Sequence, residues 1–162
     1  MTRTLDIPPD NDRELVMARW MEATPAAIWR AWTDPALLAQ WFCPKPWRVT
    51  DVAQDIRPGG NSFLIMRGPN GEEMPMRGVY LDVVPERRIV FTDAFTSAWV
   101  PSEKPFMAAS VTMEPEDGGT RYIARAGHWS VADRQQHEAM GFHQGWGICA
   151  DQLEKLARGL TV

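Results

Sequence analysis

The chain has 162 residues, 44% of them hydrophobic, and a net charge of −4, which fits one soluble globular domain with a sizeable core. The negative charge argues against nucleic acid or an anionic membrane surface as a partner. No apolar run approaches the roughly 18 residues of a membrane span, and the N-terminus has no apolar signal-peptide segment, so we expect a cytoplasmic protein without membrane contact.

Residues 1–12 predict a flexible arm, because they are polar and include two adjacent prolines. Residues 13–160 predict a single domain, since no internal repeat or low-complexity tract divides them. The two cysteines, Cys43 and Cys149, lie far apart in the sequence. Free thiols are their expected state in a reducing compartment.

One strand and two short helices are predicted after the arm. Residues 14–21 are typical of a strand. Thr24 and Asp34 are each followed by proline, which is the pattern of a helix N-cap with proline at the first helical position. Helices are therefore predicted at 25–32 and 35–41.

The middle of the chain, from residue 43 to residue 129, lacks helical periodicity and contains regular turn signals. Pro69-Asn70-Gly71 and Glu116-Asp117-Gly118-Gly119 each predict a hairpin turn. Short turns favour antiparallel pairing of neighbours, so the sequence predicts an antiparallel sheet of six or seven strands in all. The extended segments of this region are 48–56, 62–68, 74–84, 88–92, 106–114 and 120–129.

Residues 131–159 predict one long amphipathic helix. A single helix about 10 Å wide cannot fill the concave side of a twisted sheet of this size. Large side chains or a cavity must occupy the rest, and the chain has eight tryptophans and nine methionines to line that space. The apolar face of the helix consists of Ala139, Phe142, Trp146, Cys149, Ala150, Leu153, Leu156, Ala157 and Leu160.

Several motifs follow one another along the chain, among them Ala31-Trp32-Thr33-Asp34-Pro35, Arg57-Pro58-Gly59-Gly60, Gly78-Val79-Tyr80-Leu81 and Val84-Pro85-Glu86-Arg87-Arg88. In this order they resemble the START/Bet v 1-like (SRPBCC) superfamily, and within it the family of activator of heat-shock-protein-90 ATPase homologue-like proteins. The resemblance spans residues 13–158 and implies an α+β helix-grip fold, in which a curved antiparallel sheet wraps around a long C-terminal helix with a cavity between them. The family has no universal catalytic motif to carry over.

Neither a metal nor a cofactor is expected. On one helix His137 and His143 would lie about 240° apart in projection, so they could not bind one metal from one face. The sequence contains no CxxC pair, no GxSxG motif and no glycine-rich nucleotide motif.

The candidate ligand-binding residues share an expected position on the inner faces of the strands and helix, or at the mouth of the cavity. Small-molecule sites are mostly apolar with a few polar anchors. Arg67, His128 and His143 would be such anchors, unless they are hydrogen-bonded structural groups or solvated strand ends. Trp99 would be a lid residue. The candidates are Phe63, Arg67, Met76, Tyr80, Phe91, Trp99, His128, Phe142, His143 and Trp146.

The first functional hypothesis is binding of a small hydrophobic or aromatic molecule in that cavity, with tight helix-on-sheet packing as the alternative role of Trp146. The superfamily's polyketide cyclases and aromatases imply a second hypothesis, an enzyme in which Arg67, Tyr80, Asp82 or His128 acts as acid or base. The family name implies a third, a chaperone cofactor, although only about a dozen residues precede the first strand here, where full activators carry another domain. Exposed tryptophans would make a homodimer reasonable.

Overall fold

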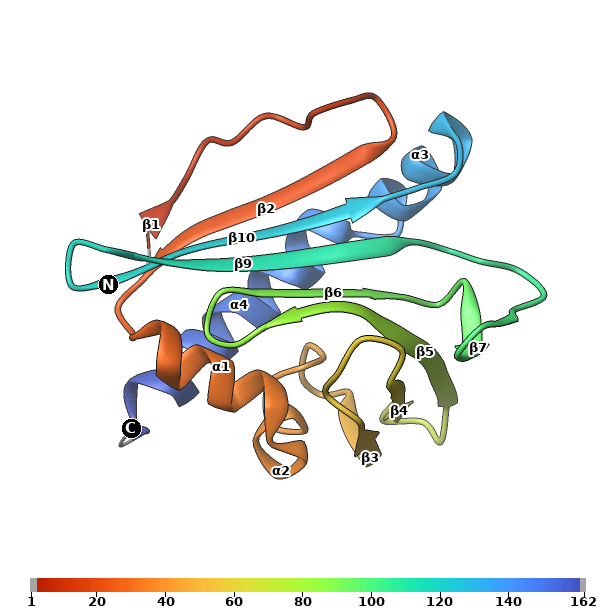
Figure 1. The fold of residues 1–162 in the computed structure, drawn as a ribbon, viewed down its shortest axis with the longest axis horizontal. Helices are drawn as coiled ribbons and strands as arrows, with labels where there is room; N and C mark the ends of the chain where they lie inside the picture. The colour runs from red at the N-terminus through yellow and green to blue at the C-terminus, as the bar shows by residue number, and fades with distance from the viewer. Residues whose placement is uncertain (1–2, 161–162) are drawn as a thin grey trace.

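A computed structural model describes residues 3–160 of the chain. One antiparallel sheet of eight strands, in the order β1-β2-β10-β9-β6-β5-β4-β3, forms the main layer, and α4 runs behind it (Figure 1). This α+β arrangement confirms the predicted helix-grip architecture. The strands are β1 Arg3–Thr4, β2 Glu14–Met21, β3 Arg48–Gln54, β4 Asn61–Arg67, β5 Glu73–Val84, β6 Arg88–Thr92, β7 Phe95–Ser97, β8 Val100–Pro101, β9 Ala108–Glu116 and β10 Gly119–Gly127. The helices are α1 Pro25–Thr33, α2 Pro35–Leu38, α3 Val131–Ala139 and α4 Phe142–Arg158.

The eighth strand is β1, which lies in the segment assigned to the arm. Arg3 and Thr4 pair with β2, and the backbone N–H of Leu5 donates to the carbonyl of Ala18 at 3.1 Å. The segment that follows runs back along β2 (Figure 1). Strands β7 and β8 form a separate small hairpin between β6 and β9 in the sequence.

The two capping signals act as the sequence predicts. The side chain of Thr24 accepts a hydrogen bond of 3.1 Å from an N–H of the first turn of α1, and Asp34 does the same for α2 at 3.0 Å. Helix α2 ends at Leu38, earlier than predicted. The chain then turns so that the indole N–H of Trp41 donates to the carbonyl of Ala31 at 3.0 Å inside the core.

A bulge in β5 decides which of its side chains point inward. The register between β5 and β6 shifts between Tyr80 and Asp82. Tyr80 therefore pairs with Phe91 on the inner face, whereas Asp82 pairs with Val90 and forms an ion pair with Arg88. A bulge inserts one residue and so reverses the alternation beyond it. Asp82, which regular alternation would place on the same face as Tyr80, therefore points to the other face.

The predicted single helix over 131–159 is in fact two helices. Gly141 has φ +96°, a left-handed conformation that ends α3 and begins a new helix direction at Phe142. As a consequence Ala139 is exposed, against its predicted place on the apolar face, and His137 is the buried residue of α3.

The core lies between the inner face of the sheet and the apolar face of α4. Phe142, Ala150, Leu153 and Ala157 of α4 are buried there. Met21, Ile89, Met113 and Tyr122 are among the sheet residues that oppose them in one continuous hydrophobic cluster. The apolar face predicted for the helix beyond Gly141 is therefore confirmed.

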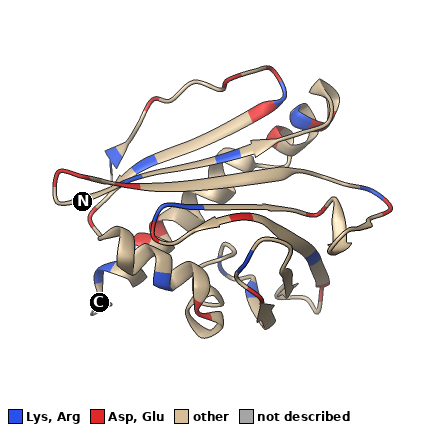
Figure 2. Cartoon of the chain, viewed as in Figure 1, with Lys and Arg blue, Asp and Glu red and all other residues tan. Residues whose placement is uncertain are grey.

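Charged residues of both signs are interspersed over strands, turns and helices (Figure 2). Many of them pair locally, as Arg67 does with Glu73 at 2.9 Å and Arg125 with Glu14 at 2.6 Å. No helix within residues 3–160 combines the length and the apolar character that crossing a membrane requires.

Candidate functional site

The end of β10 and helix α3 bring two histidines together inside the molecule. His128 directly follows β10, and Ser130 then caps α3 by accepting the N–H of Asp133 at 3.0 Å. The helix returns over the strand end, so His137 meets His128. Nε2 of His128 and Nδ1 of His137 are 2.8 Å apart, and the residues are 5% and 7% exposed. We call these two residues the histidine pair.

Hydrogen bonds determine the tautomers of the histidine pair. Nδ1 of His128 lies 2.8 Å from the carbonyl oxygen of Arg13, which can only accept, so this nitrogen carries a proton. With both rings neutral, Nε2 of His128 is then an acceptor, and Nδ1 of His137 donates to it. The remaining nitrogen of His137, Nε2, is left with a free lone pair.

Three aromatic rings surround His137. Its ring centroid lies 4.6 Å from Phe106, 5.2 Å from Phe142 and 6.0 Å from Trp146, all in edge-on arrangements. Asp93 holds Phe106 in place by accepting its backbone N–H at 2.8 Å. We call these three rings the aromatic cage.

Burial and the neighbouring His128 lower the pKa of His137 to about 4. Burial penalises the charged form because the apolar surroundings cannot replace its hydration, and a second imidazole supplies no compensating negative charge. His137 is therefore neutral near pH 7, and its free lone pair is on Nε2.

Nε2 of His137 has no hydrogen-bond partner among residues 3–160. In that part of the chain, the polar side-chain atoms that are both sealed from solvent and unpartnered are Oε1 of Gln54 and Oγ of Ser102. Nε2 of His137 is not among them, so this nitrogen keeps some contact with accessible space.

A second group of aromatic side chains fills the inner face near α1 and α2. Trp32 lies 4.9 Å from Trp41, 5.6 Å from Phe42 and 5.8 Å from Phe91 between ring centroids. Its indole N–H donates to the hydroxyl of Tyr122 at 3.1 Å. Large side chains thus occupy part of the space that a single helix cannot fill.

Gln54 adds a polar group beside these rings. Its Nε2 donates to the carbonyl of Trp32 and to the hydroxyl of Tyr80, both at 2.9 Å. Its Oε1 is one of the two sealed acceptors without a partner. An unpaired buried acceptor costs free energy unless a water or a ligand donates to it.

Both cysteines are free thiols near the same interface. Burial raises the pKa of Cys149 to about 12, and the proximity of Cys43 adds to the rise. Such a thiol is protonated near pH 7 and a poor nucleophile. No cluster of metal-ligating side chains occurs in the described part of the chain.

The structure gathers several predicted candidates on the inner side. Tyr80 and Phe91 are paired inner residues. Phe142 and Trp146 stack at 4.5 Å, and His128 reaches them through His137. Trp146 is only partly buried, although it packs against the core.

Two candidates on β4, Phe63 and Arg67, point to the other face. Leu64 and Met66 are the β4 residues that join the core, so the predicted alternation was off by one residue, which reverses every side chain. The guanidinium of Arg77 lies 4.5 Å from the Phe63 ring. Arg67 binds the side chains of Thr50, Asp51 and Glu73.

Met76 and Trp99 lie at exposed positions. Met76 pairs with Leu64 but is 37% exposed at the end of the sheet. Trp99 is 59% exposed on the β7–β8 hairpin, where its ring packs on Phe95 at 5.5 Å. Among residues 3–160, Trp99 makes its ring contact with Phe95 and not with the aromatic cage.

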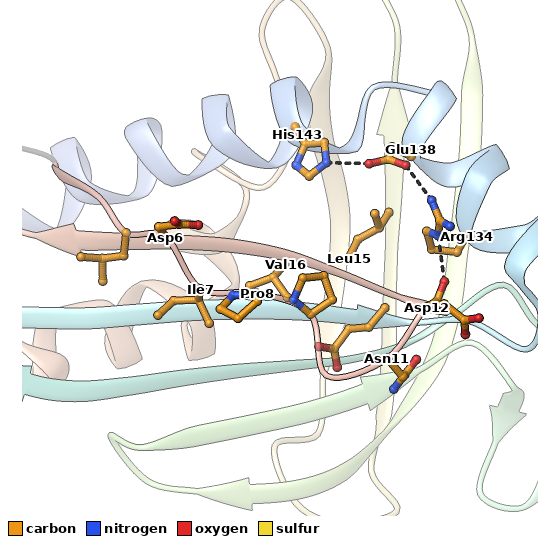
Figure 3. A pocket seen from close by; sticks show the side chains of 13 residues that line it. Asp6, Ile7, Pro8, Asn11, Asp12, Leu15, Val16, Arg134, Glu138 and His143 are labelled. Atoms are coloured by element: carbon orange, nitrogen blue, oxygen red, sulfur yellow. Dashed lines mark hydrogen bonds and ion pairs between the residues drawn. The ribbon is translucent and has the colours of Figure 1, made fainter.

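His143 lines a surface hollow of about 550 Å³ between the arm, β2 and the α3–α4 junction (Figure 3). Nε2 of His143 lies 3.0 Å from Glu138, whose other oxygen binds Arg134 at 2.9 Å. The side chain of His143 is 54% exposed. A second hollow of about 460 Å³ lies by Thr24 and Arg158. Neither hollow is lined by the aromatic cage.

Sequence reasoning missed His137, Phe106 and Gln54. The helical phase computed for an unbroken helix left His137 off the apolar face. Gly141 was the available signal for a break, because glycine favours the left-handed conformation at helix ends. Nothing local in the sequence pointed to the pairing with His128.

The sequence model of the family described as "Activator of Hsp90 ATPase homolog 1-like protein" matches residues 22–158. A crystal structure of a protein from Nitrosomonas europaea is 38% identical, covers 93% of this chain and 97% of its own, and superposes with a TM-score of 0.89. A protein from Mycobacterium smegmatis is 26% identical, covering 99% and 100% of the two chains, with a TM-score of 0.80. One from Rhodobacter sphaeroides, at 21% identity and TM-score 0.83 over 97% and 100% of the chains, shares the fold. No curated protein matches the sequence.

Proposed function

The chain belongs to the family of activator of Hsp90 ATPase homolog 1-like proteins, and from that premise we propose that it binds a small hydrophobic or aromatic molecule between the sheet and α4. A ligand-binding or cofactor-type role agrees with this fold in general. The finer proposal rests on one observation: Phe91, Met107 and Trp146 pack against the core from its inner side and yet remain partly exposed. Apolar and aromatic side chains that face inward and still reach solvent are what a ligand of the same character would cover.

Two polar atoms support the same location. Nε2 of His137 has an unused lone pair on the imidazole against which the aromatic cage packs, and Oε1 of Gln54 is a sealed acceptor beside Trp32 and Tyr80. A few convergent polar groups in apolar surroundings are typical of small-molecule sites. The surface hollow near His143 has a different character, because charged side chains, among them Asp6, Asp12, Arg134 and Glu138, line much of it.

The low pKa of His137 favours binding over acid–base catalysis. A general base works best when its pKa is close to the operating pH. A pKa of about 4 makes protonation near pH 7 unfavourable by about 4 kcal/mol. His137 can still accept a hydrogen bond, so the histidine pair suits recognition better than the enzyme alternative.

The proposal is tested by native mass spectrometry of the purified protein together with titration of a fluorescent naphthalene dye. We expect a co-purified apolar compound or saturable dye binding. In Trp146→Ala the dye affinity should fall about tenfold, equivalent to about 1.4 kcal/mol. Trp129→Ala is the matched control, because Trp129 is 49% exposed outside the core, and its dye affinity should stay unchanged. Absence of both co-purified compound and dye binding would refute the proposal.

A further inference from the structure

We infer that the ligand carries a neutral hydroxyl group on an aromatic ring, and that this hydroxyl donates a hydrogen bond to Nε2 of His137. The inference rests on the proposed function, since it identifies the class of molecule that would occupy the same space. It assigns a role to a residue that the helical pattern of the sequence did not single out.

His137 can only accept a hydrogen bond at Nε2 when both rings of the histidine pair are neutral. The carbonyl of Arg13 requires a proton on Nδ1 of His128, at 2.8 Å. With neutral rings, the 2.8 Å contact between His128 and His137 then places the proton of His137 on Nδ1. Each hydrogen bond orients the next ring, so the lone pair on Nε2 is held in a defined direction by the fold.

Aromatic rings pack against the imidazole that carries this lone pair. The rings of Phe106, Phe142 and Trp146 lie within 6.0 Å of the His137 ring, between centroids. Edge-on aromatic packing is favourable at such separations. A ligand ring packed against these side chains would bring a hydroxyl substituent within reach of Nε2 of His137.

A neutral donor suits Nε2 of His137 better than an anion does. His137 is neutral, and Glu138, the next residue, is held by Arg134 at 2.9 Å and by His143 at 3.0 Å. A guanidinium does lie near this part of α4, because Nη2 of Arg19 is 2.9 Å from the position that a Cβ on Gly147 would occupy. A carboxylate at Nε2 of His137 would meet another acceptor and gain no hydrogen bond from it, so a neutral phenol hydroxyl is the group that fits this atom.

The decisive experiment compares naphthol, methoxynaphthalene and naphthalene as probes of the full chain. The methyl ether keeps the ring and the oxygen but cannot donate. One neutral hydrogen bond predicts that naphthol binds about five- to tenfold more tightly than methoxynaphthalene. In His137→Phe this preference should disappear while naphthalene still binds. His143→Phe is the matched control and should keep the preference, because His143 lies outside the cage.

The outcomes separate the two proposals. If none of the three probes binds, the proposed function fails and the inference falls with it. If all bind with equal affinity to the unchanged protein, or if the preference for naphthol survives in His137→Phe, only the inference is overturned. A measurement without any substitution guards against misfolding: the nitrogen NMR resonance of Nε2 in His137 should shift on adding naphthol and remain in place on adding naphthalene.

Discussion

His128 and His137 form a buried hydrogen bond of 2.8 Å between Nε2 and Nδ1, although one residue ends a strand and the other lies on a helix. The pair is anchored to the backbone by Nδ1 of His128, 2.8 Å from the carbonyl of Arg13. The group that orients His128 is thus a backbone carbonyl and not a carboxylate, so it carries no negative charge. Any proton added to His137 therefore remains uncompensated, and this has consequences for stability.

Stability should fall as the pH drops from about 6.5 towards about 4. The pKa of His137 is about 4 in the folded protein because of burial and the nearby His128, against an ordinary value of 6.5. Between these two values the unfolded chain binds more protons than the folded one, so lowering the pH favours unfolding. The full effect is on the order of 3 kcal/mol, and urea unfolding at several pH values measures it.

Two substitutions to glutamine, one at His137 and one at His143, test the assignment of this decline to His137. His137→Gln should flatten the decline between pH 6.5 and pH 4, whereas His143→Gln should leave it unchanged, because the His143 side chain is 54% exposed. A decline of the same size in His137→Gln would show that other groups cause it.

Trp146→Ala should destabilise the protein less than Phe142→Ala. Phe142 is 2% exposed, and removing a fully buried phenylalanine typically costs about 3–5 kcal/mol. Trp146 is already partly exposed, so we expect a loss of about 2 kcal/mol. Chemical unfolding of both variants provides the comparison. An equal or larger loss for Trp146→Ala would assign this residue to the core alone.

Gln54→Leu should lower stability by about 1–3 kcal/mol. The substitution removes both donated hydrogen bonds, to the carbonyl of Trp32 and to the hydroxyl of Tyr80. Gln40→Leu is the control, because Gln40 is exposed and its one hydrogen bond is long, at 3.4 Å. Thermal unfolding should separate the two variants. Equal melting temperatures would show that the Gln54 bridge contributes nothing.

Two glycine substitutions at the helix junction should have opposite signs. Gly141→Ala forces alanine to φ +96°, which should cost about 1–2 kcal/mol. Gly145→Ala adds a Cβ that meets nothing within 4 Å, so the gain in helix propensity should stabilise by up to about 1 kcal/mol. Urea midpoints test the pair, and a destabilised Gly145→Ala would mean that the space beside Trp146 is needed.

Much of the fold could be predicted because its signals are local. Strand β2 occupies the predicted residues 14–21, and Thr24 and Asp34 cap the helices that their sequence contexts indicate. The apolar face of α4 follows from helical spacing alone. These features depend on residues within a few positions of one another.

The site was predicted less completely, because a side chain's direction in a strand depends on its register with neighbours. Phe63 and Arg67 were assigned to the inner face, but the pairing of β4 places Leu64 and Met66 there. The bulge after Tyr80 turns Asp82 to the face opposite the one that regular alternation would give it. A single inserted or shifted residue reverses which side chains of a strand point inward. The hydrophobicity of a short segment does not reveal such a shift.

By itself, the sequence determined the order of the elements, the capped helices and the amphipathic C-terminal helix, since each of these follows from backbone preference and hydrophobic spacing over a short stretch. Only the tertiary structure decided that His137 turns inward after the break at Gly141, that His128 reaches both His137 and the carbonyl of Arg13, and that Trp146 stays partly exposed beside them. The physical reason is that these contacts join segments up to 115 positions apart, and their geometry is set by how the sheet and helices pack together.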